Sequence, residues 1–295
     1  MIIDFHTHTF PDTIAAAAVA KLQAASHTRP FTDGTADSLR ASMRRAGIDY
    51  SVVLPVATNP RQVANINNVS AALNERTAET GILSFGCMHP DFPDARAELA
   101  RIASMGIRGI KLHPVYQGAD FDDPRYLRIL DRAGELGLIV LIHAGLDVGF
   151  PGVDRVSPEM IRRTINAVGW TTDMAGVLVL AHMGGWRQWD RVLELLPDTG
   201  VYLDTSFSLG AMTSNGDGYY QTPGDLALLS EERFLQIIRA FGIERILFGT
   251  DSPWGDQAAD LRRFRALPLT ETEQSAILGG NAARLLGLTV GIYSN

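Results

Sequence analysis

Short apolar runs alternate with amphipathic segments along most of the chain. The runs are rich in valine, isoleucine and leucine, and nearly continuous apolar character is typical of strands covered on both faces of a parallel sheet. We expect eight strands: the opening MIIDFHTH and residues 51–56, 82–87, 107–112, 138–142, 177–181, 201–203 and 245–248.

The segments between these runs carry helix signals. Pro11 and Asp12 open a helix that we expect to reach about Ala25, and a second helix is expected over 37–46. Several expected strands follow a helix-terminating glycine, as at Gly47. Eight strand–helix units in 295 residues, with no linker or close repeat, predict an α/β fold. We expect one (β/α)8 TIM barrel over residues 1–295, with extra helices in the N- and C-terminal segments.

Composition narrows the classes of partner. The net charge is -7 and no basic run stands out, so nucleic acid and anionic membranes are not expected partners. The single cysteine, Cys87, excludes an intrachain disulfide framework and argues against a thiolate zinc site. The apolar runs are too short to span a bilayer. We therefore expect a cytoplasmic protein with a small-molecule substrate, and a homodimer is compatible with this sequence.

Histidine and aspartate side chains collect where the expected strands end. In TIM barrels, chemistry is placed at the carboxyl ends of the strands. Six of the seven histidines fall at such ends, and His27 is the exception, in an expected surface loop. The residues at strand ends are His6, His8, His89, His113, His143, His182, Asp204 and Asp251. Hydrogen-bonded core histidines would be scattered, so the clustering favours a functional site.

A metal site follows from ligand chemistry. His6 and His8 lie two residues apart and so face the same side of a strand. The first and last strands are neighbours in a closed barrel, so Asp251 can approach both imidazoles. With His143, these residues are expected to converge on one divalent cation. Zinc is the first choice, with manganese, iron, nickel or cobalt as alternatives.

Lys111 allows three interpretations, because strand parity points its ammonium into the barrel, where a bare charge is costly. It can bind a substrate carboxylate or phosphate. It can be carboxylated and bridge two metals, with His143 and His182 on the second. It can instead form a structural ion pair. His113 and His89, each followed by proline, are expected to line the pocket or support the ligands.

Six stretches together resemble one family: IIDFHTH at the start, GIKLHP at 109–114, LIHAG at 141–145, LAHMGG at 180–185, LFGTDSPWGD at 247–256 and GNAARLLGL at 280–288. They resemble the amidohydrolase superfamily. The branch most similar is the amidohydrolase-related one (amidohydrolase 2) of metal-dependent TIM-barrel hydrolases, which includes aminocarboxymuconate semialdehyde decarboxylase-like enzymes.

The resemblance implies roles for single residues. It implies that His6, His8, His143 and Asp251 bind metal and that His182 is a catalytic histidine beside the ion. Lys111 departs from the decarboxylase-like pattern, because it sits where two-metal branches of the superfamily place a carboxylated lysine. The metal count therefore stays open, with one metal favoured.

The expected reaction is metal-dependent hydrolysis of a C–N or C–O bond in an amide, lactone or ester. In this hypothesis a metal-bound hydroxide attacks the carbonyl and Asp251 shuttles the proton. Lys111 and Arg187 supply positive charge, which favours a small anionic substrate. The alternative is a lyase, a non-oxidative decarboxylase of an aromatic or unsaturated acid, in which His182 delivers the proton. A non-catalytic binding protein is disfavoured because His6 and Asp251 are both retained.

Overall fold

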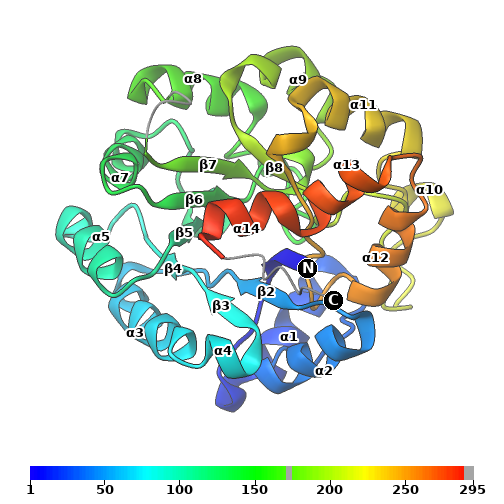
Figure 1. Cartoon of the computed structure of the whole chain (residues 1–295), viewed down its shortest axis with the longest axis horizontal. Coiled ribbons are helices and arrows are strands. Elements are labelled where there is room, and N and C mark those ends of the chain that lie inside the picture. The colour runs from blue at the N-terminus through cyan, green and yellow to red at the C-terminus, as the bar shows by residue number, and fades with distance from the viewer. Residues whose placement is uncertain (171–174, 289–295) are drawn as a thin grey trace, which may run out of the picture.

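Parallel strands form the centre of the protein in the computed structural model, which describes residues 1–170 and 175–288 (Figure 1). Two hydrogen-bonded sheets have the orders β1-β2-β3 and β4-β5-β6-β7-β8-β9. The strands are β1 (Ile3–Thr7), β2 (Tyr50–Val53), β3 (Ile82–Ser84), β4 (Gly86–Cys87), β5 (Gly109–Leu112), β6 (Ile139–Ile142), β7 (Val177–Leu180), β8 (Tyr202–Asp204) and β9 (Ile246–Leu247).

Backbone hydrogen bonds close these sheets into a barrel. β3 and β4 are two parts of one position in the ring, interrupted at Phe85. The amide of Phe85 donates to Val53 O at 2.9 Å, an ordinary length for a backbone hydrogen bond. On the other side, the amide of Phe5 in β1 donates to Phe248 O, just after β9, at 2.8 Å. The expected eight-position barrel is therefore confirmed, with the third position split in two.

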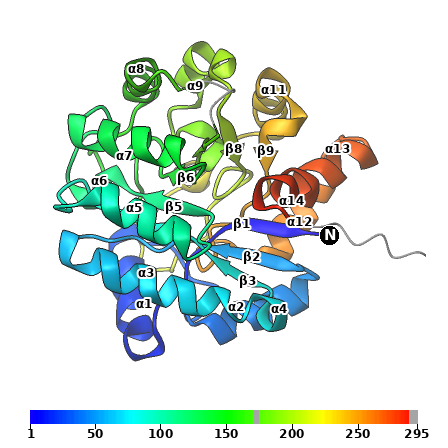
Figure 2. The same ribbon diagram turned by 60° about the vertical axis from the view of Figure 1, so that its left-hand side comes forward.

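Helices surround the strands, as the two views show (Figures 1 and 2). The expected helix from Asp12 and the one ending before Gly47 are both present, and Gly47 adopts φ 71° as the C-cap. The helices are α1 (Asp12–Ser26), α2 (Ala36–Ala46), α3 (Val63–Asn74), α4 (Thr77–Thr80), α5 (Ala95–Ser104), α6 (Pro114–Gln117), α7 (Pro124–Glu135), α8 (Pro158–Val168), α9 (Trp189–Leu195), α10 (Pro223–Leu226), α11 (Glu231–Phe241), α12 (Gln257–Arg265), α13 (Glu271–Ser275) and α14 (Asn281–Leu286).

Two apolar layers hold the barrel together. The outer layer packs the strands against the helices, and the inner layer fills the barrel with side chains such as Ile3, Phe5 and Leu141. Ala282 and Leu286 of α14 join the inner layer, so this helix closes the end of the barrel where the strands begin. Gly279 permits this closure, because a Cβ there would lie 2.3 Å from Met1 O.

Loops at the opposite end are tied to one another. Gly145, after β6, forms a parallel bridge with Trp186, after β7. Thr28, after α1, forms an antiparallel bridge with Ser214 in the long segment after β8. These bridges give the two long loops at 144–157 and 206–229 fixed partners. No helix in the described ranges has the length and apolar character needed to cross a membrane.

Candidate metal centre

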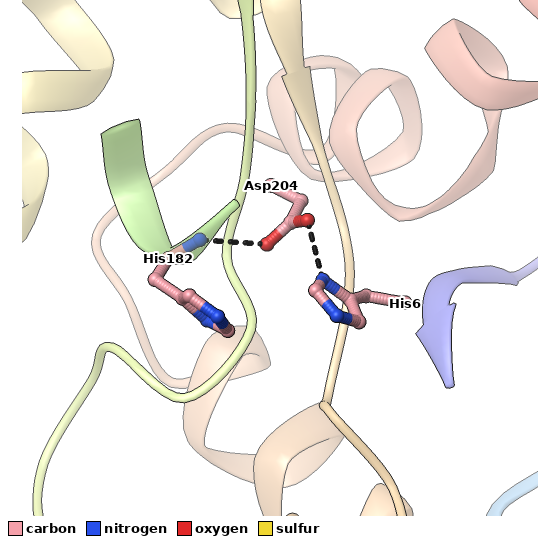
Figure 3. A group of neighbouring side chains, drawn as sticks. All are labelled: His6, His182 and Asp204. Atoms are coloured by element: carbon pink, nitrogen blue, oxygen red, sulfur yellow. Dashed lines mark hydrogen bonds and ion pairs between the residues drawn. The ribbon is translucent and has the colours of Figure 1, made fainter. Parts of the chain in front are cut away.

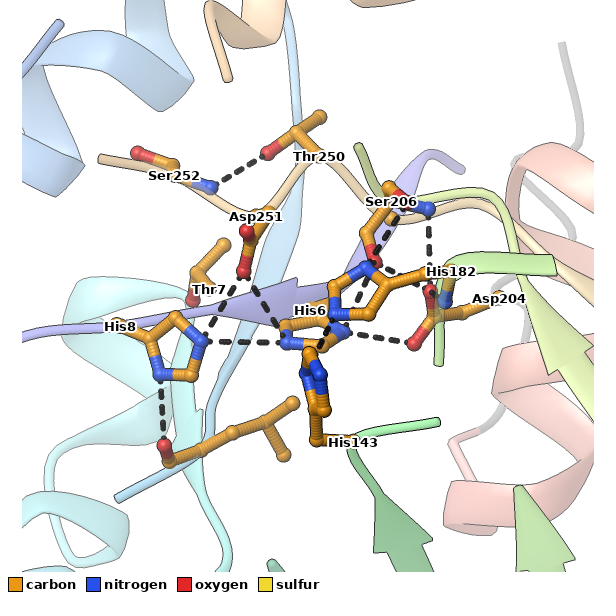
Figure 4. A network of polar contacts seen from close by, with 12 residues as sticks. His6, Thr7, His8, His143, His182, Asp204, Ser206, Thr250, Asp251 and Ser252 are labelled. Carbon is orange, nitrogen blue, oxygen red and sulfur yellow. Dashed lines mark hydrogen bonds and ion pairs between the residues drawn. The ribbon is translucent and has the colours of Figure 1, made fainter. Parts of the chain in front are cut away.

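Three ligand atoms lie together at the carboxyl ends of β1 and β9 (Figure 4). His6 Nε2 is 3.2 Å from His8 Nε2, and Asp251 Oδ1 is 3.3 Å and 3.1 Å from these two nitrogens. Ligands bound about 2.0–2.2 Å from one cation lie about 3.0–3.4 Å from each other. The three atoms are therefore spaced as ligands of a single metal ion.

The protons of the two imidazoles point away from this meeting point. His6 Nδ1 lies 2.7 Å from Asp204 Oδ2, and His8 Nδ1 lies 2.8 Å from Leu54 O. Both partners only accept hydrogen bonds, so each Nδ1 carries the proton and each Nε2 presents a lone pair. Two lone pairs and a carboxylate oxygen then converge. Such a donor set fits a divalent cation.

Asp251 reaches the site through an unusual backbone conformation. Its φ is 64°, in the left-handed region, and its amide donates to His6 O at 2.8 Å. Burial alone raises the pKa of this carboxyl, but the hydrogen bond with His8 and the electrostatic interactions with His6 and His182 lower it to about 2. Asp251 is therefore a carboxylate at neutral pH, as a metal ligand must be.

His143 lies beside His182 rather than within the group formed by His6, His8 and Asp251. Its Nδ1 is 3.1 Å from His182 Nε2, and its Nε2 is 3.0 Å from Leu146 O. Donation to this carbonyl leaves a lone pair on Nδ1. The facing nitrogens of His143 and His182 therefore share either a proton or a cation. The contacts of His143 thus lie outside the triad of His6, His8 and Asp251. A role for His143 as a fourth ligand of the same ion is implied by the family resemblance alone.

Lys111 lies inside the barrel at the end of β5, as strand parity predicted. Its side chain is 1% exposed, and Nζ is 3.3 Å from His6 Nε2. Burial lowers its pKa to about 8, although Asp204, Asp251 and Asp147 act in the opposite direction. Within the described part of the chain no carboxylate lies within 4.0 Å of Nζ, so a structural ion pair does not account for this ammonium.

His113 lies next to the site but is bonded within the protein. Its ring stacks between Tyr116 and His143, with ring centroids 3.9 Å and 4.2 Å away. Nδ1 accepts from the Tyr116 amide at 3.4 Å, so Nε2 carries the proton and faces Asp147 Oδ2 at 3.4 Å. His113, His143 and Asp147 also form a group whose ligand atoms could hold a metal ion. That His113 only supports its neighbours, through hydrogen bonding and stacking, stays a prediction.

The structure does not bring His89 and Arg187 into contact with the triad. His89 is buried, and its Nδ1 accepts from the amide of Asp91 at 3.1 Å. Arg187 is exposed, lies 5.0 Å from the centre of the Trp186 ring, and donates to Asp225 O. A direct role for either residue in substrate binding stays a prediction.

Two carboxylates near the site were not singled out from the sequence for a role. Asp204 ends β8 and contacts both His6 and the backbone of His182 (Figure 3). Asp147 lies in the loop after β6 and faces His113. The signal for Asp204 was its place at a strand end, the same signal that identified the histidines. No local pattern marked Asp147.

Solved structures share the fold at low sequence identity. One is 5-carboxyvanillate decarboxylase LigW from Sphingomonas paucimobilis, with 18% identity, a TM-score of 0.64 and coverage of 98% of this chain and 99% of that one. Another is a dihydroxybenzoic acid decarboxylase from Polaromonas sp. JS666 with bound manganese and the inhibitor 2-nitroresorcinol. It has 15% identity, a TM-score of 0.62 and coverage of 99% of both chains. A third is a probable 2-pyrone-4,6-dicarboxylic acid hydrolase from Acinetobacter baumannii. It has 16% identity, a TM-score of 0.63 and coverage of 97% of this chain and 99% of that one.

Sequence comparison identifies the family. No curated protein is significantly similar to this chain. The profile of the family described as Amidohydrolase matches residues 3–288, which is nearly the whole chain. The order of the histidine and aspartate motifs had led to the same expectation. The chain belongs to this amidohydrolase family, on the amidohydrolase-2 branch of the TIM-barrel amidohydrolase superfamily.

Proposed function

We propose that this protein is a metal-dependent carboxy-lyase that removes CO2 from a small aromatic or unsaturated carboxylic acid. The observation that carries the proposal is the buried ammonium of Lys111, which lies 3.3 Å from His6 Nε2 without a carboxylate partner among the described residues. A substrate carboxylate would supply that partner. The decarboxylases among the structures of the same fold support this choice of reaction.

The donor set names the residues that would hold the metal. His6, His8 and Asp251 would bind one divalent cation, and the facing nitrogens of His143 and His182 form a second donor pair. Zinc and manganese both suit imidazole and carboxylate ligands. When bound, a cation supplies Lewis-acid chemistry that polarises oxygens of the substrate. One domain over residues 1–295 remains our proposal for the organisation of the chain.

Residues of the chain perform the remaining tasks. Lys111 holds the substrate carboxylate, which fixes the C–C bond that breaks. His182 delivers a proton to the carbon that CO2 leaves, so an acid anion and one proton yield CO2 and the protonated product. Burial lowers the pKa of His182, with Asp251 and Asp204 opposing, so the ring takes up the transferred proton from solvent in each turnover. His8 and Asp251 are 19% and 13% exposed, so the substrate approaches from their side.

Hydrolysis of an amide, lactone or ester is the second candidate. Lys111 Nζ lies beside His6 of the first donor group. His143 and His182 form a second donor pair, so the residues also suit the alternative in which a carboxylated Lys111 would serve two cations. In that reaction Asp251 accepts a proton from the attacking water. A probable hydrolase also occurs among the structures with this fold.

A product assay separates the two reactions. A panel of benzoates and unsaturated acids labelled with 13C in the carboxyl group is incubated with protein loaded with zinc or manganese. Decarboxylation releases labelled CO2 and, in D2O, leaves one deuterium on the product carbon. Lactones, esters and amides of the same acids form the second panel. Hydrolysis of these without CO2 release would replace the proposed reaction. Asp251→Asn protein is the control for contaminating enzymes.

A further inference from the structure

One buried carboxylate bonds to two different histidines of the candidate centre. Asp204 is 0% exposed and ends β8. Its Oδ2 lies 2.7 Å from His6 Nδ1, and its Oδ1 accepts from the backbone amide of His182 at 3.1 Å (Figure 3). β1 and the segment after β7 are thereby tied to β8 through one side chain.

The remaining contacts of Asp204 fix its own orientation. Oδ1 also accepts from the amide of Ser206 at 3.0 Å and from Ser206 Oγ at 2.5 Å. Three of its four donors are therefore on Oδ1, which leaves Oδ2 for His6 alone. The carboxylate cannot rotate without losing several bonds at once, so it presents a fixed acceptor to His6.

We infer that Asp204 is a positioning residue that sets the tautomer of His6 and thereby prepares the metal centre. An imidazole has one proton, and it occupies whichever nitrogen faces the better acceptor. Held on Nδ1 by Asp204, it leaves the Nε2 lone pair directed at His8 and Asp251. This inference rests on the proposed function, since it assumes that the triad binds a cation.

The distances separate this role from that of a ligand. His6, His182 and Asp204 also form a group that can in principle hold a metal. However, the 2.7 Å between His6 Nδ1 and Asp204 Oδ2 is a hydrogen-bond length, shorter than the about 3.0–3.4 Å expected between two ligands of one ion. The other oxygen is already bonded to backbone amides. Asp204 therefore acts on the cation through His6.

The Asp204→Asn substitution tests this role, because it changes the hydrogen bonding of the side chain and hardly changes its shape. Its amide has nearly the same shape but only one acceptor oxygen, whereas Asp204 receives donors on both oxygens. If the oxygen faces His6, the amide NH2 meets the backbone N–H groups of His182 and Ser206. If the oxygen faces those groups, the NH2 meets His6 and favours the proton on Nε2. Either orientation disturbs the centre.

The test measures metal affinity directly. Dissociation constants for zinc and manganese are determined on metal-free protein by competition with a chelator, without any substrate. We expect binding to weaken about 10- to 100-fold in Asp204→Asn, the usual effect of removing such a carboxylate. The matched control is Asn281→Ala at the closed end of the barrel, where the side chain is 2% exposed and donates to Ile243 O and Ile246 O. This change should lower the melting temperature and leave both dissociation constants unchanged.

A second measurement reads the tautomer itself. The 15N shifts of His6 in histidine-labelled, metal-free protein distinguish a proton on Nδ1 from one on Nε2. We expect Nδ1–H in the unsubstituted protein and a loss of this preference in Asp204→Asn. An Nε2–H signal in the unsubstituted protein, or an Asp204→Asn affinity within twofold of it, would overturn the inference. If the unsubstituted protein binds neither metal, the proposed function fails, and the tautomer measurement still tests whether Asp204 holds the proton of His6 on Nδ1. Because this measurement uses the unsubstituted protein, it remains decisive even if Asp204→Asn does not fold.

Discussion

His143 and His182 face each other through Nδ1 and Nε2, 3.1 Å apart, although 39 residues separate them in the chain. The second nitrogen of His143 points to Leu146 O. His143 is therefore oriented toward His182, whereas Asp251 is the residue that meets His6 and His8.

This orientation predicts that His143 is dispensable for the first cation. We expect His143→Ala protein to retain one ion per chain, held by His6, His8 and Asp251. Elemental analysis of dialysed protein measures the count. A fall from two ions to one would identify the facing nitrogens as a second metal site. Complete loss of metal would mean that His143 ligates the first ion, as the family resemblance implies.

Asp251 tests the ligand set with little damage to the fold. Asparagine tolerates the left-handed region better than other non-glycine residues, so Asp251→Asn should keep the φ of 64°. Removing the charge should reduce turnover by at least about 100-fold and weaken metal binding. Circular dichroism and the melting temperature should stay close to those of the unsubstituted protein. Near-normal turnover would remove Asp251 from the mechanism.

Lys111→Met separates substrate binding from stability. Methionine keeps most of the volume and removes a buried charge, so the free energy of unfolding should be unchanged or higher. We expect kcat/KM for a carboxylate substrate to fall by at least about 100-fold, because the ammonium loses its role as counter-ion. Lys21 is the only other lysine in the chain and is exposed, so Lys21→Met is the matched control. Equal losses in both variants would contradict the proposal.

Asp260 should make stability depend on pH. Burial raises the pKa of this carboxyl to about 7, although Arg263 lowers it. Between about pH 4 and pH 7, the folded state keeps a proton on Asp260 that the unfolded state has lost. The stabilisation that comes from this difference therefore decreases as pH rises from about 4 and is lost once pH has passed 7. Asp260→Asn lacks the titration. In urea unfolding, the variant should gain stability relative to the unsubstituted protein between pH 4 and pH 8. A constant difference over this range would refute the assignment.

Gly145 should tolerate no side chain. Its φ is 83°, and a Cβ would lie 2.3 Å from the amide nitrogen of Trp186. Gly145→Ala should therefore separate the loops after β6 and β7, with a large loss of stability and activity. Gly152 has a similar φ of 80° but open space around it, so Gly152→Ala isolates the backbone strain of about 1–2 kcal/mol. Similar unfolding midpoints for the two variants would show that the close approach is unimportant.

The sequence was sufficient for the barrel because its signals are local. Buried strands need apolar runs, and a histidine such as His6 at the end of one is placed by strand geometry alone. Closure of the ring then brings Asp251 to it without any further information. The approach of these residues was therefore predictable from strand order.

The details within the site depend on contacts between distant segments. The contact with Asp204 determines which nitrogen of His6 faces His8 and Asp251. The hydrogen bond to Asp225 O determines the direction of Arg187. Neither contact leaves a pattern near the residue concerned. Exposure also mattered, since Arg187 and Lys111 are both cations in the sequence, but only Lys111 is buried beside His6.

The pairing of β1 with the segment after β9 bears on how the site appears during synthesis. His6 and His8 are synthesised before Asp251, which follows His8 by 243 positions, and before Ser252, which bridges to Thr7. Until that later segment has been made, the two histidines lack their carboxylate. A chain that is interrupted before Asp251 therefore cannot assemble these three ligands.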